Sequence, residues 1–200
     1  MNTEAIGLLA GLLGLLSVIP YCVRVWQRKI RPNPTSWFVW SLLSGILLFN
    51  YKETGVGASI WLAVVGFLNV GTVFVLTLLR QRSEWSKPDR LEVATLTIGM
   101  ISVAYLLTSG QADNALYIGI FADIWAVAPT VRGAWRRPLQ DRPYAWLMFA
   151  IASMISMFAI TDGSLSSYAL PVYYAIAELL VAIPLVLHRC KERIPLREWV

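Results

Sequence analysis

Charged residues are scarce in this chain. Asp, Glu, Lys and Arg make up only 14% of its 200 residues, whereas 57% are hydrophobic, and the mean hydropathy is +0.60. A soluble domain of this length would need far more charge on its surface. The composition therefore excludes an ordinary soluble globular protein.

Cysteine and histidine are also few. The chain has two cysteines, Cys22 and Cys190, and a single histidine, His188. They cannot supply a zinc site, a disulfide framework, or the Ser–His pair or HExxH motif of hydrolytic enzymes. Asp123 and Glu178 could mimic a membrane aspartyl dyad, but no Gly-containing Asp motif accompanies them. We therefore expect no enzyme, no catalytic residue, no metal site and no cofactor.

Long apolar runs, by contrast, occupy almost the whole sequence. About 20 residues at 1.5 Å per residue are needed to cross roughly 30 Å of hydrocarbon. The first run is not a signal peptide, because no basic residue precedes it and no small-residue cleavage site follows. The predicted fold class is an all-α integral membrane protein with seven transmembrane helices, at 5–25, 36–51, 57–79, 91–109, 115–135, 144–161 and 165–188.

The basic residues gather on one side of these helices. Of the 17 Lys and Arg, only Lys52 falls on the opposite side. This bias is the positive-inside signal, so we expect a cell (plasma or inner) membrane protein with its N-terminus outside and its C-terminus in the cytoplasm. The basic loops suit anionic lipid at that face, and we expect no nucleic-acid partner. The other 16 basic residues are Arg24, Arg28, Lys29, Arg31, Arg80, Arg82, Lys87, Arg90, Arg132, Arg136, Arg137, Arg142, Arg189, Lys191, Arg193 and Arg197.

The sequence also contains an internal repeat. A shift of 109 residues superposes three helices on three others and leaves the fourth as a linker. The expected domains are a first repeat at 1–82, a linker with the fourth helix at 83–112, and a second repeat with a short basic tail at 113–200. Because the linker helix crosses the membrane once between two units of three helices, both units have the same orientation. They form a parallel repeat related by an axis along the membrane normal. The identities are Pro20/Pro129, Trp26/Trp135, Arg28/Arg137, Pro34/Pro143, Trp37/Trp146, Ser44/Ser153, Ile46/Ile155 and Phe49/Phe158.

This layout resembles a family. The layout has three helices, one linker helix and three further helices. A proline lies near the basic end of the first and fifth helices, and the second helix carries a tryptophan. This arrangement is similar to the SWEET, PQ-loop and nicotinamide-riboside transporter superfamily. The chain departs from the Pro-Gln pair of PQ-loop proteins, with Pro20-Tyr21 and Pro129-Thr130 instead. The resemblance implies a small-solute transporter whose site lies between the repeats, lined by the third and seventh helices.

Three polar residues fall at mid-membrane. Glu178 precedes Arg189 by 11 residues and Asp123 precedes Arg136 by 13, or about 16 and 20 Å of helix. A charge in the hydrocarbon costs roughly 2.5–3.5 kcal/mol, so each needs a reason. Asn69 matches Glu178 in the repeat register. We take all three as candidate solute-binding residues. The alternative is that the carboxyls are protonated and structural, and that Asn69 joins helices.

Aromatic and hydroxyl groups accompany them. Tyr174 lies one turn before Glu178, while Trp40 and Ser44 lie on one stripe of the second helix, with Ser153 as the echo of Ser44. Rings beside hydroxyls suit a sugar, a nucleoside or an organic cation. Trp40 is as consistent with packing as with binding. We assign Trp26, Trp37, Trp135 and Trp146 to the aromatic belt at the membrane interface.

Pro20 and Pro129 each remove a helix hydrogen bond at equivalent places in the repeats. They predict a hinge of a gate, or else static curvature. Taken together, the residues favour a small-solute transporter, either proton-coupled or specific for a cationic, amine-bearing or vitamin-like solute. The alternative is a non-transporting receptor, scaffold or assembly factor on the same fold. A cavity reaching Glu178 would favour transport. Whether the chain forms a homo-oligomer is left open.

Overall fold

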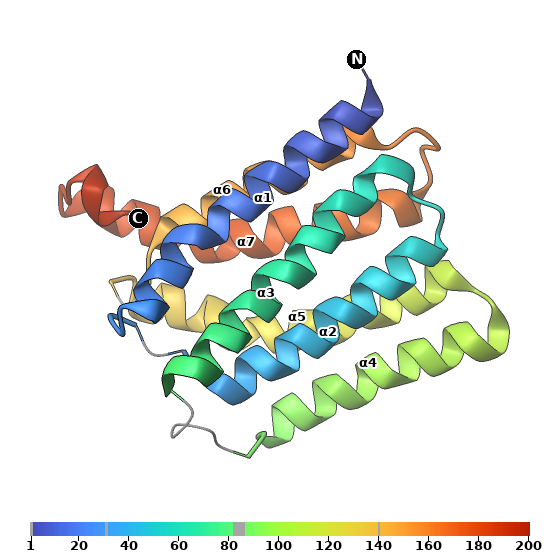
Figure 1. The fold of residues 1–200 in the computed structure, drawn as a ribbon, viewed down its shortest axis with the longest axis horizontal. Coiled ribbons are helices and arrows are strands. Elements are labelled where there is room, and N and C mark those ends of the chain that lie inside the picture. Colours follow the sequence, from blue (N-terminus) through green and yellow to red (C-terminus); the bar gives the residue numbers. More distant parts are fainter. Residues whose placement is uncertain (1, 31, 82–86, 140) are drawn as a thin grey trace.

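The computed structural model describes residues 2–30, 32–81, 87–139 and 141–200. Arg31, Arg82 and the predicted boundary between the first repeat and the linker lie outside them. The described residues form α-helices and short 3-10 turns, which confirms the all-helical fold (Figure 1). The elements are α1 (Thr3–Trp26), α2 (Pro34–Glu53), η1 (Gly57–Ser59), α3 (Ile60–Gln81), α4 (Arg90–Ser109), α5 (Ala112–Arg136), α6 (Pro143–Ser156), η3 (Met157–Ala159), α7 (Leu165–Lys191) and η4 (Leu196–Glu198).

Five of these helices are long and apolar enough to cross a membrane: α1, α3 together with η1, α4, α5 and α7. Helix α2 is also 20 residues long, but it carries inward-facing polar residues such as Ser44 and Asn50 that lower its hydropathy. Helix α6 with η3 covers only Pro143–Ala159, or about 25 Å. Seven crossings therefore remain a prediction.

Local signals set the helix ends. Asn33 caps α2 by accepting a hydrogen bond from the Thr35 amide at 2.9 Å, and Pro34 occupies the first turn, where its missing N–H costs nothing. Asp89 and Glu92 form a capping box at the start of α4. That helix ends at Gly110, whose φ of 67° is left-handed and favours glycine.

The helices pack as two groups of three beside a single helix. Helix α3 contacts both α1 and α2, and α7 contacts both α5 and α6. The two groups meet where α1 contacts α6 and α2 contacts α5, which closes a ring. Helix α4 lies outside the ring against α5 and α2 (Figure 1). The ring leaves α4 out of its interior.

Small and polar residues hold α4 and α5 against α2. Asn50 is fully buried and donates to the Ser102 hydroxyl at 3.0 Å and to the Ala115 carbonyl at 3.2 Å. A Cβ on Gly119 would lie 3.1 Å from Leu47 and 3.3 Å from Asn50. Asn50 thus joins the linker helix α4 to α2 and α5, and Gly119 lets α5 approach α2 closely.

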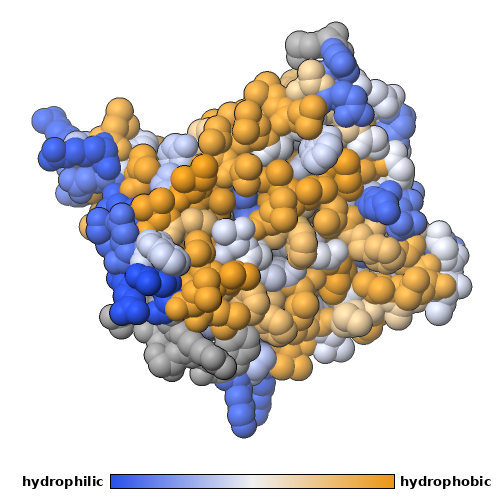
Figure 2. Space-filling model, in the orientation of Figure 1, coloured by the Kyte–Doolittle hydropathy of each residue, from blue (hydrophilic) through white to orange (hydrophobic). Residues whose placement is uncertain are grey.

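The surface has an apolar middle and two polar ends. Figure 2 shows a broad band of hydrophobic side chains over the middle of the helices, with hydrophilic side chains at the ends. Exposed residues on α1 include Leu8, Leu12 and Ile19. We call the end where α1, α3, α5 and α7 finish the basic end, after Arg24, Arg136 and their neighbours, and the opposite end the acidic end.

Candidate solute-binding site

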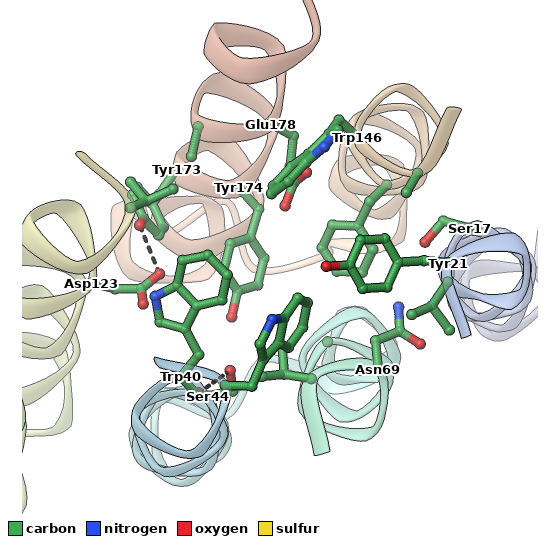
Figure 3. Close-up of a pocket in the computed structure, with 18 residues that line it drawn as sticks. Ser17, Tyr21, Trp40, Ser44, Asn69, Asp123, Trp146, Tyr173, Tyr174 and Glu178 are labelled. Carbon is green, nitrogen blue, oxygen red and sulfur yellow. Dashed lines mark hydrogen bonds between the residues drawn. The ribbon is translucent and has the colours of Figure 1, made fainter. Parts of the chain in front are cut away.

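A cavity of about 140 Å³ lies inside the helical ring (Figure 3). All six ring helices contribute to its wall, and α4 does not. Its polar and aromatic lining residues are Ser17 and Tyr21 from α1, Trp37, Trp40 and Ser44 from α2, Asn69 from α3, Asp123 from α5, Trp146 and Phe149 from α6, and Tyr173, Tyr174 and Glu178 from α7.

The structure brings together six of the seven residues proposed from the sequence for solute binding: Asn69, Asp123, Glu178, Trp40, Tyr174 and Ser44. Ser153 does not line this cavity. Its side chain is fully buried within the packing of α6, and its hydroxyl donates to the Phe149 carbonyl at 2.8 Å. Phe149, one turn earlier, lines the cavity instead and carries no polar group.

The side of the cavity formed by α5 and α7 is acidic. Asp123 accepts a hydrogen bond from the Tyr173 hydroxyl at 2.7 Å. Glu178 projects into the same space, and the described residues offer its carboxyl no hydrogen-bond partner (Figure 3). No lysine, arginine or histidine is among the described residues of the cavity wall. The site therefore holds two carboxyl groups without a counter-ion from the protein.

The opposite side, formed by α1, α2 and α3, is neutral. The Asn69 amide donates to the Gly14 carbonyl at 2.9 Å, and Ser17 donates to the same carbonyl at 2.6 Å. Ser44 donates to the Trp40 carbonyl at 2.7 Å. Because these hydrogens point at the backbone, the hydroxyl oxygens retain only acceptor capacity, and Asn69 Oδ1 is buried without a partner. This side carries no charged side chain among its described residues; its serines offer acceptor oxygens, and the Trp37 and Trp40 indoles carry N–H donors.

Aromatic rings fill most of the remaining wall. The Phe149 and Tyr174 rings lie edge to face at 5.7 Å, and the Tyr173 and Tyr174 rings lie 5.5 Å apart. Trp40 meets Trp37 edge to face at 5.3 Å. The negative face of an aromatic ring attracts cations. Rings and carboxyl groups thus favour the same kind of ligand.

The cavity is separated from the basic end by side chains only. Three further cavities of about 330, 510 and 220 Å³ lie at that end, and Tyr21 and Asp141 line all three. The first of them shares four lining residues with the central cavity. We call these four, Tyr21, Trp37, Trp40 and Trp146, the aromatic layer.

The acidic end is closed by a packed core. Tyr51 is fully buried, donates to the Ser167 carbonyl at 2.7 Å and lies 2.9 Å from the Ser59 hydroxyl. Leu47, Leu62, Leu116 and Leu170 are buried around it. The central cavity is therefore nearer to opening at the basic end than at the acidic end.

The two prolines proposed as hinges lie away from the central cavity. Pro20 is inside α1 and Pro129 inside α5. Pro129 lines the cavity of about 330 Å³ and Pro20 the one of about 220 Å³, both at the basic end. They are placed beside the aromatic layer, and a hinge there stays a prediction.

Sequence reasoning misses several cavity residues. Tyr173 is a sequence neighbour of Tyr174 and so points about 100° away on an ideal helix, but the cavity is wide enough to include both. Trp37 and Trp146 line the cavity rather than the lipid-facing surface, unlike Trp26 and Trp135, which are exposed. The repeat register does not separate the two sets, because Trp26 and Trp135 also form a matched pair.

Comparisons of the chain with protein-family models, with curated proteins and with solved structures found no match.

Proposed function

We propose that this chain is a small-solute membrane transporter of the SWEET and PQ-loop type, with its site between two parallel three-helix repeats, and that its solute is cationic or amine-bearing. One observation carries the proposal: the Asp123 and Glu178 carboxyl groups share an aromatic cavity whose described lining residues include no cationic side chain. Uncompensated buried charge is costly, so a site of this kind needs a cation or a proton from outside.

The helix contacts support the repeat. A shift of 109 residues converts α1, α2 and α3 into α5, α6 and α7, and it turns the contact of α1 with α6 into that of α5 with α2. The cavity wall follows the same register. Both members of four pairs line it: Val18/Val127, Trp37/Trp146, Trp40/Phe149 and Asn69/Glu178. A site on a repeat axis is what alternating access by rocking of two units requires.

The cavity also favours transport over a scaffold role. A scaffold would gain stability by packing Glu178 tightly, whereas here the carboxyl group lines a cavity. The aromatic layer on one side and the Tyr51 core on the other fit an occluded state closest to opening at the basic end. By the positive-inside rule that end faces the cytoplasm in a cell membrane. The same carboxyl groups could exchange a proton for the cation, and so couple the two movements.

A thermal-shift experiment on detergent-purified protein tests the solute class. Matched probes differ in charge alone: choline against 3,3-dimethylbutan-1-ol, and glucosamine against glucose. A ligand at 100 times its Kd stabilises the folded state by about 2.7 kcal/mol. We expect the charged member of at least one pair to raise the Tm and its neutral partner to leave the Tm unchanged.

Uptake into proteoliposomes of the amine with the largest shift then tests transport. Accumulation above protein-free liposomes supports a transporter. Binding without uptake would favour a receptor on the same fold. Equal shifts from the charged and neutral members of every pair would show that the carboxyl groups do not select the solute.

A further inference from the structure

Asp141 lies outside the central cavity, yet it contacts a residue of the cavity wall. It precedes α6, and one of its carboxyl oxygens accepts a hydrogen bond from the Trp146 indole at 3.0 Å. The other accepts from the Arg142 amide at 2.7 Å. Trp146 lines both the central cavity and the adjacent cavity at the basic end, so its ring stands between them. The Asp141 carboxyl thus holds one member of the aromatic layer.

The turn that carries Asp141 is itself fixed. Arg189 is buried and donates to the Asp141 carbonyl at 2.6 Å and to the Pro138 carbonyl at 2.9 Å. The Tyr144 amide, at the start of α6, donates to the Trp199 carbonyl at 3.2 Å. Two segments from the end of the chain therefore anchor the peptide on which Asp141 sits.

Among the described residues, the first repeat shows no carboxylate bonded to the tryptophan that matches Trp146. In the 109-residue register Trp146 matches Trp37, but Asp141 matches Pro32, which has no side-chain acceptor. Trp37 instead packs on Tyr21 at 5.4 Å and Trp40 at 5.3 Å. Arg80, the match of Arg189, donates to the Trp26 carbonyl at 3.1 Å. Of the two matched tryptophans in the aromatic layer, the one from α6 is held by a carboxylate.

We propose that Asp141 is a positioning residue that keeps the Trp146 ring across the passage from the basic-end cavities to the central cavity, and so controls access from that end. The inference rests on the proposed function only in taking this passage as the solute's route. A hydrogen bond to a charged acceptor is stronger than one between neutral groups, so its loss should favour the open position of the ring about tenfold.

Cysteine accessibility in detergent tests this without requiring transport. A reporter, Val127→Cys, lies in the cavity wall outside the aromatic layer, in a background with Cys22→Ala and Cys190→Ala. The probe is 2-aminoethyl methanethiosulfonate, and the readout is the labelling rate by mass. We expect Asp141→Ala to raise the rate about tenfold. Asp162→Ala, which removes a carboxylate bonded to Ser167 at the acidic end, should leave the rate unchanged.

Two tryptophan variants separate the hydrogen bond from ring size. Trp146→Phe removes the indole N–H and part of the ring, and the effect of Asp141→Ala should disappear in its background. Trp37→Phe makes the same reduction in size where no carboxylate is attached, so its effect should add to that of Asp141→Ala. A rate within twofold of the parent for Asp141→Ala overturns the proposal, as does full additivity with Trp146→Phe. If Asp141→Ala does not fold, an unchanged rate in Trp146→Phe alone overturns it.

Discussion

Replacing Glu178 with glutamine tests the charge in the cavity. The substitution keeps the shape of the side chain but removes its negative charge. Truncating one member of a buried charge pair costs roughly 2–5 kcal/mol in binding. We expect the lower end, about 2 kcal/mol or a 30-fold higher Kd, because Asp123 remains charged nearby. Asp123 already accepts the Tyr173 hydroxyl, so the unpartnered Glu178 should be the main site for a cation.

The assay is equilibrium binding of the amine probe with the largest thermal shift, repeated for its neutral counterpart. Glu53→Gln makes the same change on an exposed side chain at the acidic end and serves as the control. With proton coupling, uptake by Glu178→Gln should also lose its dependence on pH between about 5 and 8. Unchanged affinity for the charged probe, together with an unchanged pH response, would show that this carboxyl group is structural and would refute the reasoning.

Three further outcomes follow from the fold. Tyr51→Phe removes a buried hydroxyl that is hydrogen-bonded to Ser167 and Ser59, so the Tm in detergent should fall by the equivalent of about 1–3 kcal/mol. The same substitution at the exposed Tyr117 should leave the Tm unchanged. Equal Tm values for Tyr51→Phe and the parent would contradict the closure at the acidic end. An impermeant thiol reagent applied to intact cells should label cysteines placed at Thr54 and Gln111 but not native Cys190. All three proteins carry Cys22→Ala, and the Thr54 and Gln111 variants also have Cys190 replaced. The reverse labelling pattern would invert the topology. Burial raises the pKa of Asp141, although the hydrogen bonds of Arg142 and Trp146 and the charge of Arg189 oppose the rise. The folded protein therefore holds a proton that the unfolded chain has lost, and the free energy of unfolding should fall as pH rises from about 3.9 through the raised pKa. Asp141→Asn should flatten that slope, and an identical slope in the variant would assign the pH dependence to another group.

The positions of the helices could be read from the sequence because hydropathy and helix-end signals agree. The run predicted at 91–109 is α4 at Arg90–Ser109, bounded by the Asp89 capping box and the left-handed Gly110. The run at 165–188 is α7 at Leu165–Lys191, whose N-cap Ser164 accepts from the Ser167 amide. In each case a local feature of two or three residues stops or starts a long apolar segment. No long-range information is needed.

The candidate site was predictable in depth but not in direction. Helical rise places Asp123, Glu178 and Asn69 at mid-membrane, and the structure places all three on one cavity. The rise per residue along a helix does not show which side chain of a neighbouring helix fills the space beside a residue. Ser153 matches Ser44 in the repeat register and makes the same hydrogen bond to the carbonyl four residues earlier, yet only Ser44 lines the cavity, because Ser153 is fully buried in the packing of α6. Trp37 and Trp146 likewise turn inward because the packing of α2 and α6, not distance from the helix end, sets their direction.

Both carboxyl groups of the central cavity come from the proposed second repeat, and the 109-residue register suggests a physical reason. Glu178 matches Asn69, and Asp123 matches Gly14, whose carbonyl accepts the Asn69 and Ser17 hydrogens. A Cβ at Gly14 would lie 3.2 Å from Val65 and 3.4 Å from Phe149, so any side chain there requires Val65 to give way by a few tenths of an ångström.

A fully symmetric site would also place four carboxyl groups around about 140 Å³. At low dielectric their mutual repulsion would far exceed what one bound cation returns. With glycine and amide at the matching positions, two carboxyl groups remain in the cavity, and one monovalent cation together with one proton would neutralise them. On this reasoning, Asn69→Asp should weaken folding rather than strengthen cation binding, and a lower Tm with no gain in affinity for the charged probe would be the expected result.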